Sequence, residues 1–414
     1  MGGVESSACG SCDCDVSATA PAAWEPTSSL RPLPEAPIGK DPMRILDEKF
    51  ERAELLEGKK NAARAKALLQ EVLRGYGNLL GWEHLKTGRV HFSLGSVAYD
   101  SKEYGTAKSR YEQALLIGRS MANSDGDDEA LGLVANSLNN LGMTNHRLGD
   151  LLEARRCYEE AAEVKRDTLG ERHSEVANVY NNLAAVACEE GNFGEARELY
   201  TRDLDIMIST LGGPTHEDIA PCFSNLGNVA FQRRDFAEAK ALYWRALDIQ
   251  RRAYGNDHLA VARTYINLAL VVEEQCEWRV ANEFYSQALQ IQVVHLGRKH
   301  PEVARSTADV ALMEARIAAA SGNLCGAKKL YRRALELYDE LPGSNESRVL
   351  DAEEELEDVL LRMYRPDQRK YGRSRRTRNR ITSDRSNGST TASLSGSIHG
   401  SMWSESDIDI ASLP

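Results

Sequence analysis

The chain has 414 residues, of which 42% are hydrophobic, and a formal net charge of −11 at pH 7. This hydrophobic content is that of an ordinary folded protein, and the acidic balance argues against a nucleic-acid partner for the folded region. No apolar run approaches the ~18 residues of a membrane-spanning helix, and the start lacks the basic-then-apolar layout of a secretory signal. We therefore expect a cytoplasmic protein.

Residues 1–41 carry five prolines and few apolar residues, so we predict a disordered N-terminal segment. Its start fits the N-myristoylation pattern, with Gly2 exposed once Met1 is removed and Ser6 at the required position. One myristoyl chain binds membranes only marginally, and a palmitoylated cysteine is a common second anchor. The candidate lipidation residues, which would tether the protein to the cytosolic face of a membrane, are Gly2, Cys9, Cys12 and Cys14. The alternatives are a chance match and a zinc site, although CxxCxC offers three of the four ligands that a closed zinc site uses.

A spaced pattern of leucine, small and aromatic residues recurs along most of the chain. From Leu141, small residues lie one, thirteen and twenty positions on, at Gly142, Ala154 and Ala161, and Tyr158 lies seventeen positions on. The equivalent leucines Leu141, Leu183, Leu226 and Leu268 lie 42, 43 and 42 residues apart. A fixed period in this range is typical of a solenoid of stacked supersecondary units.

The spacing predicts two helices in each unit. A small residue beside the leucine lets the two helices approach closely, and a Gly or polar turn eight residues on ends the first helix. The Ala, Tyr and Ala that follow share one face of the second helix, because neighbours on a helix surface lie three and four residues apart. We therefore predict an all-α, right-handed α-solenoid of stacked helix-turn-helix repeats with disordered N- and C-terminal tails.

The predicted units follow one another along the chain. Residues 42–86 keep a weakened pattern and are predicted to be a degenerate capping repeat. About six full repeats span 87–341, and an acidic amphipathic helix over 342–364 closes the array. Residues 365–414 are basic and then Ser-rich, which predicts a disordered tail. Its basic block is open to four interpretations: a membrane-surface patch, a nuclear signal, a nucleic-acid arm or a solubilising tail with phosphorylation sites.

One histidine precedes each of five predicted first helices, namely His84, His173, His216, His258 and His300. Stacked units place such residues about 10 Å apart, which is too far for a shared metal with bonds of ~2 Å. We therefore interpret them as turn residues. The sequence shows no nucleophile elbow, phosphate loop, HExxH or paired CxxC, so we predict no catalytic residue, no metal site and no cofactor.

The Leu-Gly…Gly…Ala…Tyr…Ala pattern resembles the tetratricopeptide repeat, over residues 87–341 and more loosely over 43–341. With Asn-Asn-Leu at the start of units and Leu-Gly-x-x-His between them, the pattern is similar to the repeats of kinesin light chains. The resemblance implies a superhelix whose concave face is lined by the first helix of each unit. In tetratricopeptide domains that clamp peptides, an Asn stands just before the leucine, as it does here at Asn140, Asn182, Asn225 and Asn267.

The resemblance thus implies a peptide-binding set, consisting of Arg89, Asn140, Asn182, Asn225, Asn228, Arg263 and Asn267. An Asn side chain both donates and accepts hydrogen bonds, so it can pair with a peptide amide. The arginines suit acidic side chains or a terminal carboxylate. The alternative is that the asparagines brace one repeat against the next.

We predict a non-catalytic protein-interaction scaffold that binds an extended peptide in the concave groove and is tethered to a membrane by acylation. A kinesin light chain-like motor–cargo adaptor is the alternative among binding proteins. Kinesin light chains join their heavy chain through a long coiled coil, whereas only residues 1–41 and one helical pair precede the repeats here, which argues against a kinesin heavy chain partner. The alternative from another class is an enzyme whose site no motif reveals.

Overall fold

The computed structural model describes residues 41–57, 61–122, 128–341 and 346–364. These residues form fifteen α-helices and one 3-10 turn, η1 (Glu217–Ile219), with no strand among them. The predicted all-α solenoid is confirmed. The predicted N-terminal segment up to residue 40 and the tail 365–414 lie outside the described residues, and so do Gly2, Cys9, Cys12 and Cys14.

The helices alternate between a first and a second helix of successive units. The first helices are α1 (Pro42–Glu57), α3 (Leu85–Asp100), α5 (Asp128–Leu148), α7 (Ser174–Glu189), α9 (Ala220–Gln232), α11 (Leu259–Glu274) and α13 (Pro301–Ala320). The second helices are α2 (Ala62–Leu79), α4 (Tyr104–Ala122), α6 (Leu151–Leu169), α8 (Phe193–Thr210), α10 (Phe236–Tyr254), α12 (Trp278–Leu296) and α14 (Leu324–Asp339). A final helix, α15 (Glu346–Tyr364), follows them.

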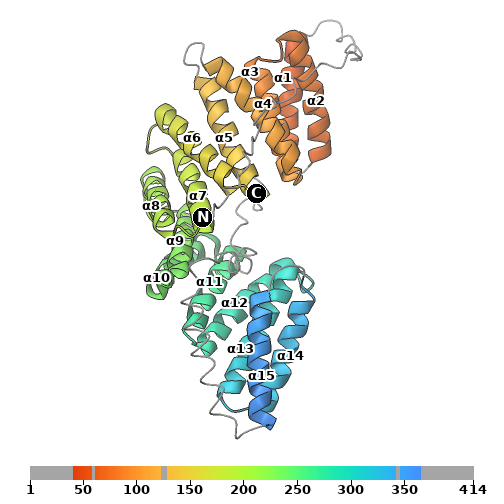
Figure 1. The fold of residues 1–414 in the computed structure, drawn as a ribbon. Coiled ribbons are helices and arrows are strands. Elements are labelled where there is room, and N and C mark those ends of the chain that lie inside the picture. Colours follow the sequence, from red (N-terminus) through yellow and green to blue (C-terminus); the bar gives the residue numbers. More distant parts are fainter. Residues whose placement is uncertain (1–40, 58–60, 123–127, 342–345, 365–414) are drawn as a thin grey trace, which may run out of the picture.

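Each helix packs against its neighbours in the chain, so the units stack into a curved array (Figure 1). Successive first helices also touch one another, α1 with α3, α3 with α5 and α5 with α7. Successive second helices approach one another less. From α1 to α7 the first helices therefore lie on the inner, concave side of the curve.

A tyrosine of the second helix packs against the small residue of the first helix. A Cβ atom placed on Gly142 would lie 2.6 Å from the Tyr158 ring, closer than real Cβ atoms approach other atoms. Gly95 and Gly227 meet Tyr111 and Tyr243 in the same way, and all three rings are buried. The helices of these units are thus closer together than an alanine would permit, as the pattern predicted.

The five histidines are N-caps. Four of them cap the first helices α3, α7, α11 and α13, and His216 caps the 3-10 turn η1, which leads into α9. In each, Nδ1 accepts a hydrogen bond of 3.1–3.3 Å from the backbone N–H two residues on, as seen at His84, His173, His216, His258 and His300. The first N–H groups of a helix have no partner within the helix, so an acceptor here stabilises its start. The interpretation as turn residues is confirmed, and the imidazole is the capping group.

Candidate functional site

The predicted concave-face asparagines occupy one position in successive first helices. Asn182, Asn225 and Asn267 each lie nine residues after the capping histidine of their unit, and each is half-buried. Asn140 has the equivalent place on α5, one residue before Leu141. In α13 the same position, nine residues after His300, carries Asp309. We call these five residues the inner column.

Asparagines of neighbouring first helices bond to one another. The Asn225 side chain donates to Asn181 Oδ1 at 2.8 Å, and the Asn182 side chain donates to Asn139 Oδ1 at 3.1 Å. Asn139 and Asn181 are not in the predicted peptide-binding set, although the Asn-Asn-Leu pattern places each of them directly before a predicted residue. The structure therefore contains the hydrogen bonds of the bracing alternative.

These bonds leave part of each amide group unused. A side-chain amide offers two N–H groups and a carbonyl that accepts two hydrogen bonds. Asn182 and Asn225 each use one N–H in the bond to the preceding first helix. Asn267 makes no side-chain hydrogen bond to any other described residue. Bracing the stack is thus compatible with binding a further partner through the same side chains.

Two other predicted asparagines contact tyrosines of second helices. Asn140 Nδ2 donates to the Tyr111 hydroxyl at 3.3 Å. The Tyr243 hydroxyl donates to Asn228 Oδ1 at 2.7 Å. Both asparagines are half-buried, and each keeps amide groups that these bonds do not use. They extend the polar inner surface from α5 to α9.

The structure does not bring the two predicted arginines together. Arg89 lies on α3 and Arg263 on α11, with the first helices α5, α7 and α9 between them. Arg89 is exposed, pairs with Glu129 at 3.0 Å and lies over the Phe50 ring. Arg263 is half-buried and forms no ion pair with another described residue. Of the two, only Arg89 is held in an ion pair within the described part of the chain.

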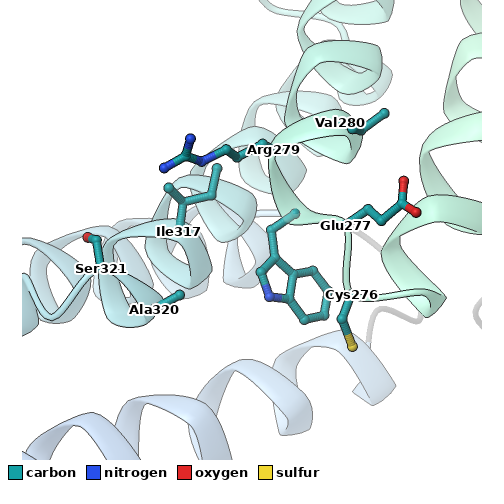
Figure 2. A pocket seen from close by; sticks show the side chains of 8 residues that line it. Cys276, Glu277, Arg279, Val280, Ile317, Ala320 and Ser321 are labelled. Carbon is teal, nitrogen blue, oxygen red and sulfur yellow. The ribbon is translucent and has the colours of Figure 1, made fainter.

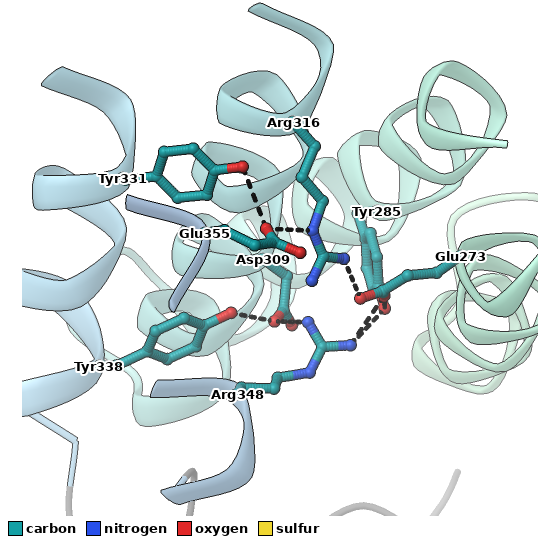
Figure 3. A network of polar contacts seen from close by, with 8 residues as sticks. All are labelled: Glu273, Tyr285, Asp309, Arg316, Tyr331, Tyr338, Arg348 and Glu355. Carbon is teal, nitrogen blue, oxygen red and sulfur yellow. Dashed lines mark hydrogen bonds and ion pairs between the residues drawn. The ribbon is translucent and has the colours of Figure 1, made fainter. Parts of the chain in front are cut away.

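A buried polar network closes the C-terminal end of the array (Figure 3). Arg348 of α15 donates to Asp309 Oδ1 at 2.8 Å and to Glu273 Oε2 at 2.9 Å. Arg316 of α13 donates to Glu273 Oε1 at 2.7 Å and to Glu355 Oε2 at 2.9 Å. Sequence patterns did not reveal this network, because its arginines and carboxylates lie 39 to 75 residues apart.

The pKa values of the two carboxylates bonded to Arg348, those of Asp309 and Glu273, are shifted in opposite directions. Burial raises the pKa of Asp309 above its ordinary value, and Arg348 opposes this shift only in part. Burial also acts to raise the pKa of Glu273, but Arg348 and Arg316 together hold it below its ordinary value. Glu273, which faces two guanidinium groups, is therefore the more firmly ionised of the two.

A pocket lies between the α11–α12 turn and the end of α13 (Figure 2). It is lined by Cys276, Glu277, Trp278, Arg279, Val280, Ile317, Ala320 and Ser321. None of the predicted site residues lines it, and it holds no histidine that would activate the Cys276 thiol.

In the ranges that the structure describes, no group of three or more His, Cys, Asp or Glu side chains is placed to hold a metal ion. No helix in this part of the chain is both long enough and apolar enough to cross a membrane.

Comparisons with known proteins agree with this architecture. The tetratricopeptide repeat family model matches residues 133–209, 175–243 and 218–292. The apo form of RapI superposes with a TM-score of 0.52 at 13% identity, over 71% of this chain and 98% of that chain. The apo form of the quorum sensor NprR from B. thuringiensis superposes with a TM-score of 0.51 at 16% identity, over 78% of this chain and 89% of that chain.

Repeats assigned to a kinesin light chain of Podosopora anserina are also similar, with a TM-score of 0.36 at 18% identity, over 62% of this chain and 97% of that chain. A search of curated protein sequences finds no match. At these identities the likenesses to RapI and NprR show the fold alone.

Proposed function

We propose that this chain, which contains tetratricopeptide repeats, is a non-catalytic scaffold that binds an extended peptide along the concave face of the array. The observation that carries the proposal is the inner column, in which half-buried asparagines recur at one position of α5, α7, α9 and α11. Each has a donor or an acceptor that the stack does not use, and such groups suit the amides of a peptide backbone.

The spacing of the column suits an extended chain. Packed helices lie about 10 Å apart, and an extended peptide advances ~3.3 Å per residue. Successive first helices therefore meet about every third residue of the peptide. Between these contacts, side chains of the peptide reach the flanking surface, where Asn178 and Asn136 are exposed one helical turn before Asn182 and Asn140.

A peptide-binding experiment with paired variants tests the proposal. Short random peptides are selected on the wild-type chain, and the affinity of a selected peptide is measured by fluorescence anisotropy. The Asn182→Ala/Asn225→Ala chain loses two contacts to the peptide, and at about 1 kcal/mol for each hydrogen bond we expect the affinity to fall about 30-fold.

The matched control is the Asn139→Ala/Asn181→Ala chain. It loses the same two hydrogen bonds between helices, and also the bond of 3.3 Å from Asn139 to Asn140 Oδ1, but it keeps the side chains of Asn182 and Asn225. We expect this control to bind the peptide within about threefold of the wild type, since its loss is confined to the stack. Equal loss of affinity in both chains would assign the asparagines to bracing alone and end the proposal.

We also propose that the scaffold is attached to a membrane through myristoylated Gly2 and palmitoylated Cys9, Cys12 or Cys14. The support is the N-terminal sequence, in which one acylation pattern is followed directly by cysteines that can carry a second chain. The Gly2→Ala chain is expected to move from the membrane fraction to the soluble fraction of a cell lysate, with Gly3→Ala as its control. An unchanged distribution of the Gly2→Ala chain would show that the proposed lipid anchor is wrong.

A further inference from the structure

We propose that Glu273, Asp309, Tyr285 and Tyr338 form a binding site for an arginine side chain, which Arg348 fills in cis until an arginine of a partner peptide replaces it. The four residues come from α11, α13, α12 and α14. The last two repeats thus supply all four groups. The final helix α15 supplies the occupant Arg348, and also Glu355, which pairs with Arg316 beside the site (Figure 3).

The contacts of Arg348 are those of a bound guanidinium. One terminal nitrogen donates to Asp309 at 2.8 Å, and the other donates to Glu273 at 2.9 Å and to the Tyr285 hydroxyl at 2.8 Å. The guanidinium carbon lies 5.7 Å from the centre of the Tyr285 ring. The planar guanidinium group has several N–H donors in fixed directions, so it can donate hydrogen bonds to two carboxylates at once. The compact ammonium group of a lysine does not offer this geometry.

The carboxylates are held in place without help from the first turn of α15, where Arg348 lies. The Tyr338 hydroxyl donates to Asp309 Oδ1 at 2.7 Å. The Tyr285 hydroxyl and Arg316 donate to the two oxygens of Glu273, each at 2.7 Å. The acceptors are therefore already oriented when an arginine arrives, which lowers the cost of ordering them on binding.

The place of Arg348 in α15 lets the occupant leave. Arg348 is the third residue of this helix, whereas the buried apolar residues Ala352 and Val359 come later. Glu355, which pairs with Arg316, also lies beyond the first turn. Helix ends open more readily than helix centres, because their first N–H groups have no partner in the helix. Unwinding the first turn withdraws Arg348 while the remainder of α15 stays packed.

The site continues the inner column. Asp309 has the position in α13 that Asn267 has in α11, so a peptide that follows the asparagines arrives at Asp309. Removal of Arg348 leaves the buried Asp309 without its guanidinium partner, while Glu273 keeps its bond from Arg316. An uncompensated buried charge is strongly unfavourable. The emptied site therefore selects a cation, and its geometry selects a guanidinium. This inference rests on the proposed peptide binding for its partner.

The first test empties the site in the full chain with Arg348→Ala and supplies a small cation. At ~10 mM, methylguanidinium is expected to raise the melting temperature of this chain by about 2 °C, and methylammonium is expected to leave it unchanged. The control is Arg332→Ala, which removes an exposed arginine of α14 and should respond to neither cation. Equal responses of the Arg348→Ala chain to the two cations would overturn the assignment.

The second test uses the wild-type chain and so does not depend on how Arg348→Ala folds. Hydrogen exchange is expected to be faster in the first turn of α15 than around Val359. Excess acetyl-Gly-Arg-Gly-amide should accelerate exchange of that turn further, whereas the lysine analogue should not. Exchange of α15 as one slow unit, unaffected by either peptide, would make Arg348 a permanent part of the core and overturn the proposal.

Neither readout involves Asn182 or Asn225. Failure of the arginine site therefore leaves the peptide-binding proposal intact, and the paired asparagine variants test that proposal separately.

Discussion

The Asn225 side chain donates a hydrogen bond to Asn181 at 2.8 Å, and the two residues are 44 positions apart in the sequence. The bond joins the first helices of two consecutive units, α9 and α7, on the inner side of the array. Because an amide has more donors and acceptors than this bond uses, Asn225 stabilises the stack and still offers groups to a partner.

Asn225 and Asn181 should be energetically coupled. Each single change to Ala removes the bond, so the double variant should be less destabilised than the sum of the two single variants by about 1 kcal/mol. Urea unfolding of the four chains measures this difference. A coupling energy indistinguishable from zero would mean that the bond does not hold the two helices together in solution.

Gly142→Ala should destabilise the protein by about 1–3 kcal/mol, because the added methyl group would lie 2.6 Å from the Tyr158 ring. The control lies on the same helix. Gly132 has nothing within 4 Å of the added carbon, so Gly132→Ala should stabilise the protein by about 0.5–1 kcal/mol through helix propensity. Thermal melts of the two variants should shift in opposite directions, and equal shifts would contradict the close approach of α5 and α6.

His91 should make the protein less stable in mild acid. Burial lowers the pKa of His91 from 6.5 to about 4, and Arg110 lowers it as well. The unfolded chain therefore binds the proton first as the pH falls, and stability is lost between pH 6.5 and about 4. The contribution is on the order of 3 kcal/mol.

The His91→Gln chain tests this contribution, because glutamine does not titrate. Its unfolding free energy, measured by urea titration at several pH values, should depend less on pH than that of the wild type. Parallel curves for the two chains would show that His91 does not couple folding to protonation.

His300→Ala should remove the N-cap of α13 and cost about 1 kcal/mol of stability. His300→Asn should preserve most of that stability, since a side-chain oxygen can accept the same hydrogen bond. Urea unfolding at neutral pH compares the two. If the alanine and asparagine chains unfold alike, the imidazole contributes through packing and not through its acceptor nitrogen.

Several features of the site follow from local pattern. The helical period places Asn182 and Asn225 at one position of successive first helices, so their shared face could be predicted without coordinates. The same holds for Gly142 and Tyr158, whose spacing forecast the close approach of two helices. Asn139 and Asn181 could have been proposed from the sequence, since each directly precedes a predicted residue. Their role in joining the repeats could not, because each accepts a hydrogen bond from an asparagine of the next unit.

The arginine site could not be predicted from the sequence. Arg348 looked like one charge on an acidic amphipathic helix, and Asp309 replaces the asparagine of the other units. The contact between Arg348 and Glu273 spans 75 residues. No periodic signal joins them, because α15 has no capping histidine and lies outside the repeat pattern.

The amino-acid sequence by itself determined the helix pairs, the turns between them and the order of the units. These features depend on residues within a few helical turns of one another. At that range, helix geometry converts the separation along the chain into a distance in three dimensions. Only the tertiary structure decided which polar side chains are partners. A hydrogen bond or a buried ion pair depends on a few tenths of an ångström between distant segments, and that distance exists only after the units have stacked.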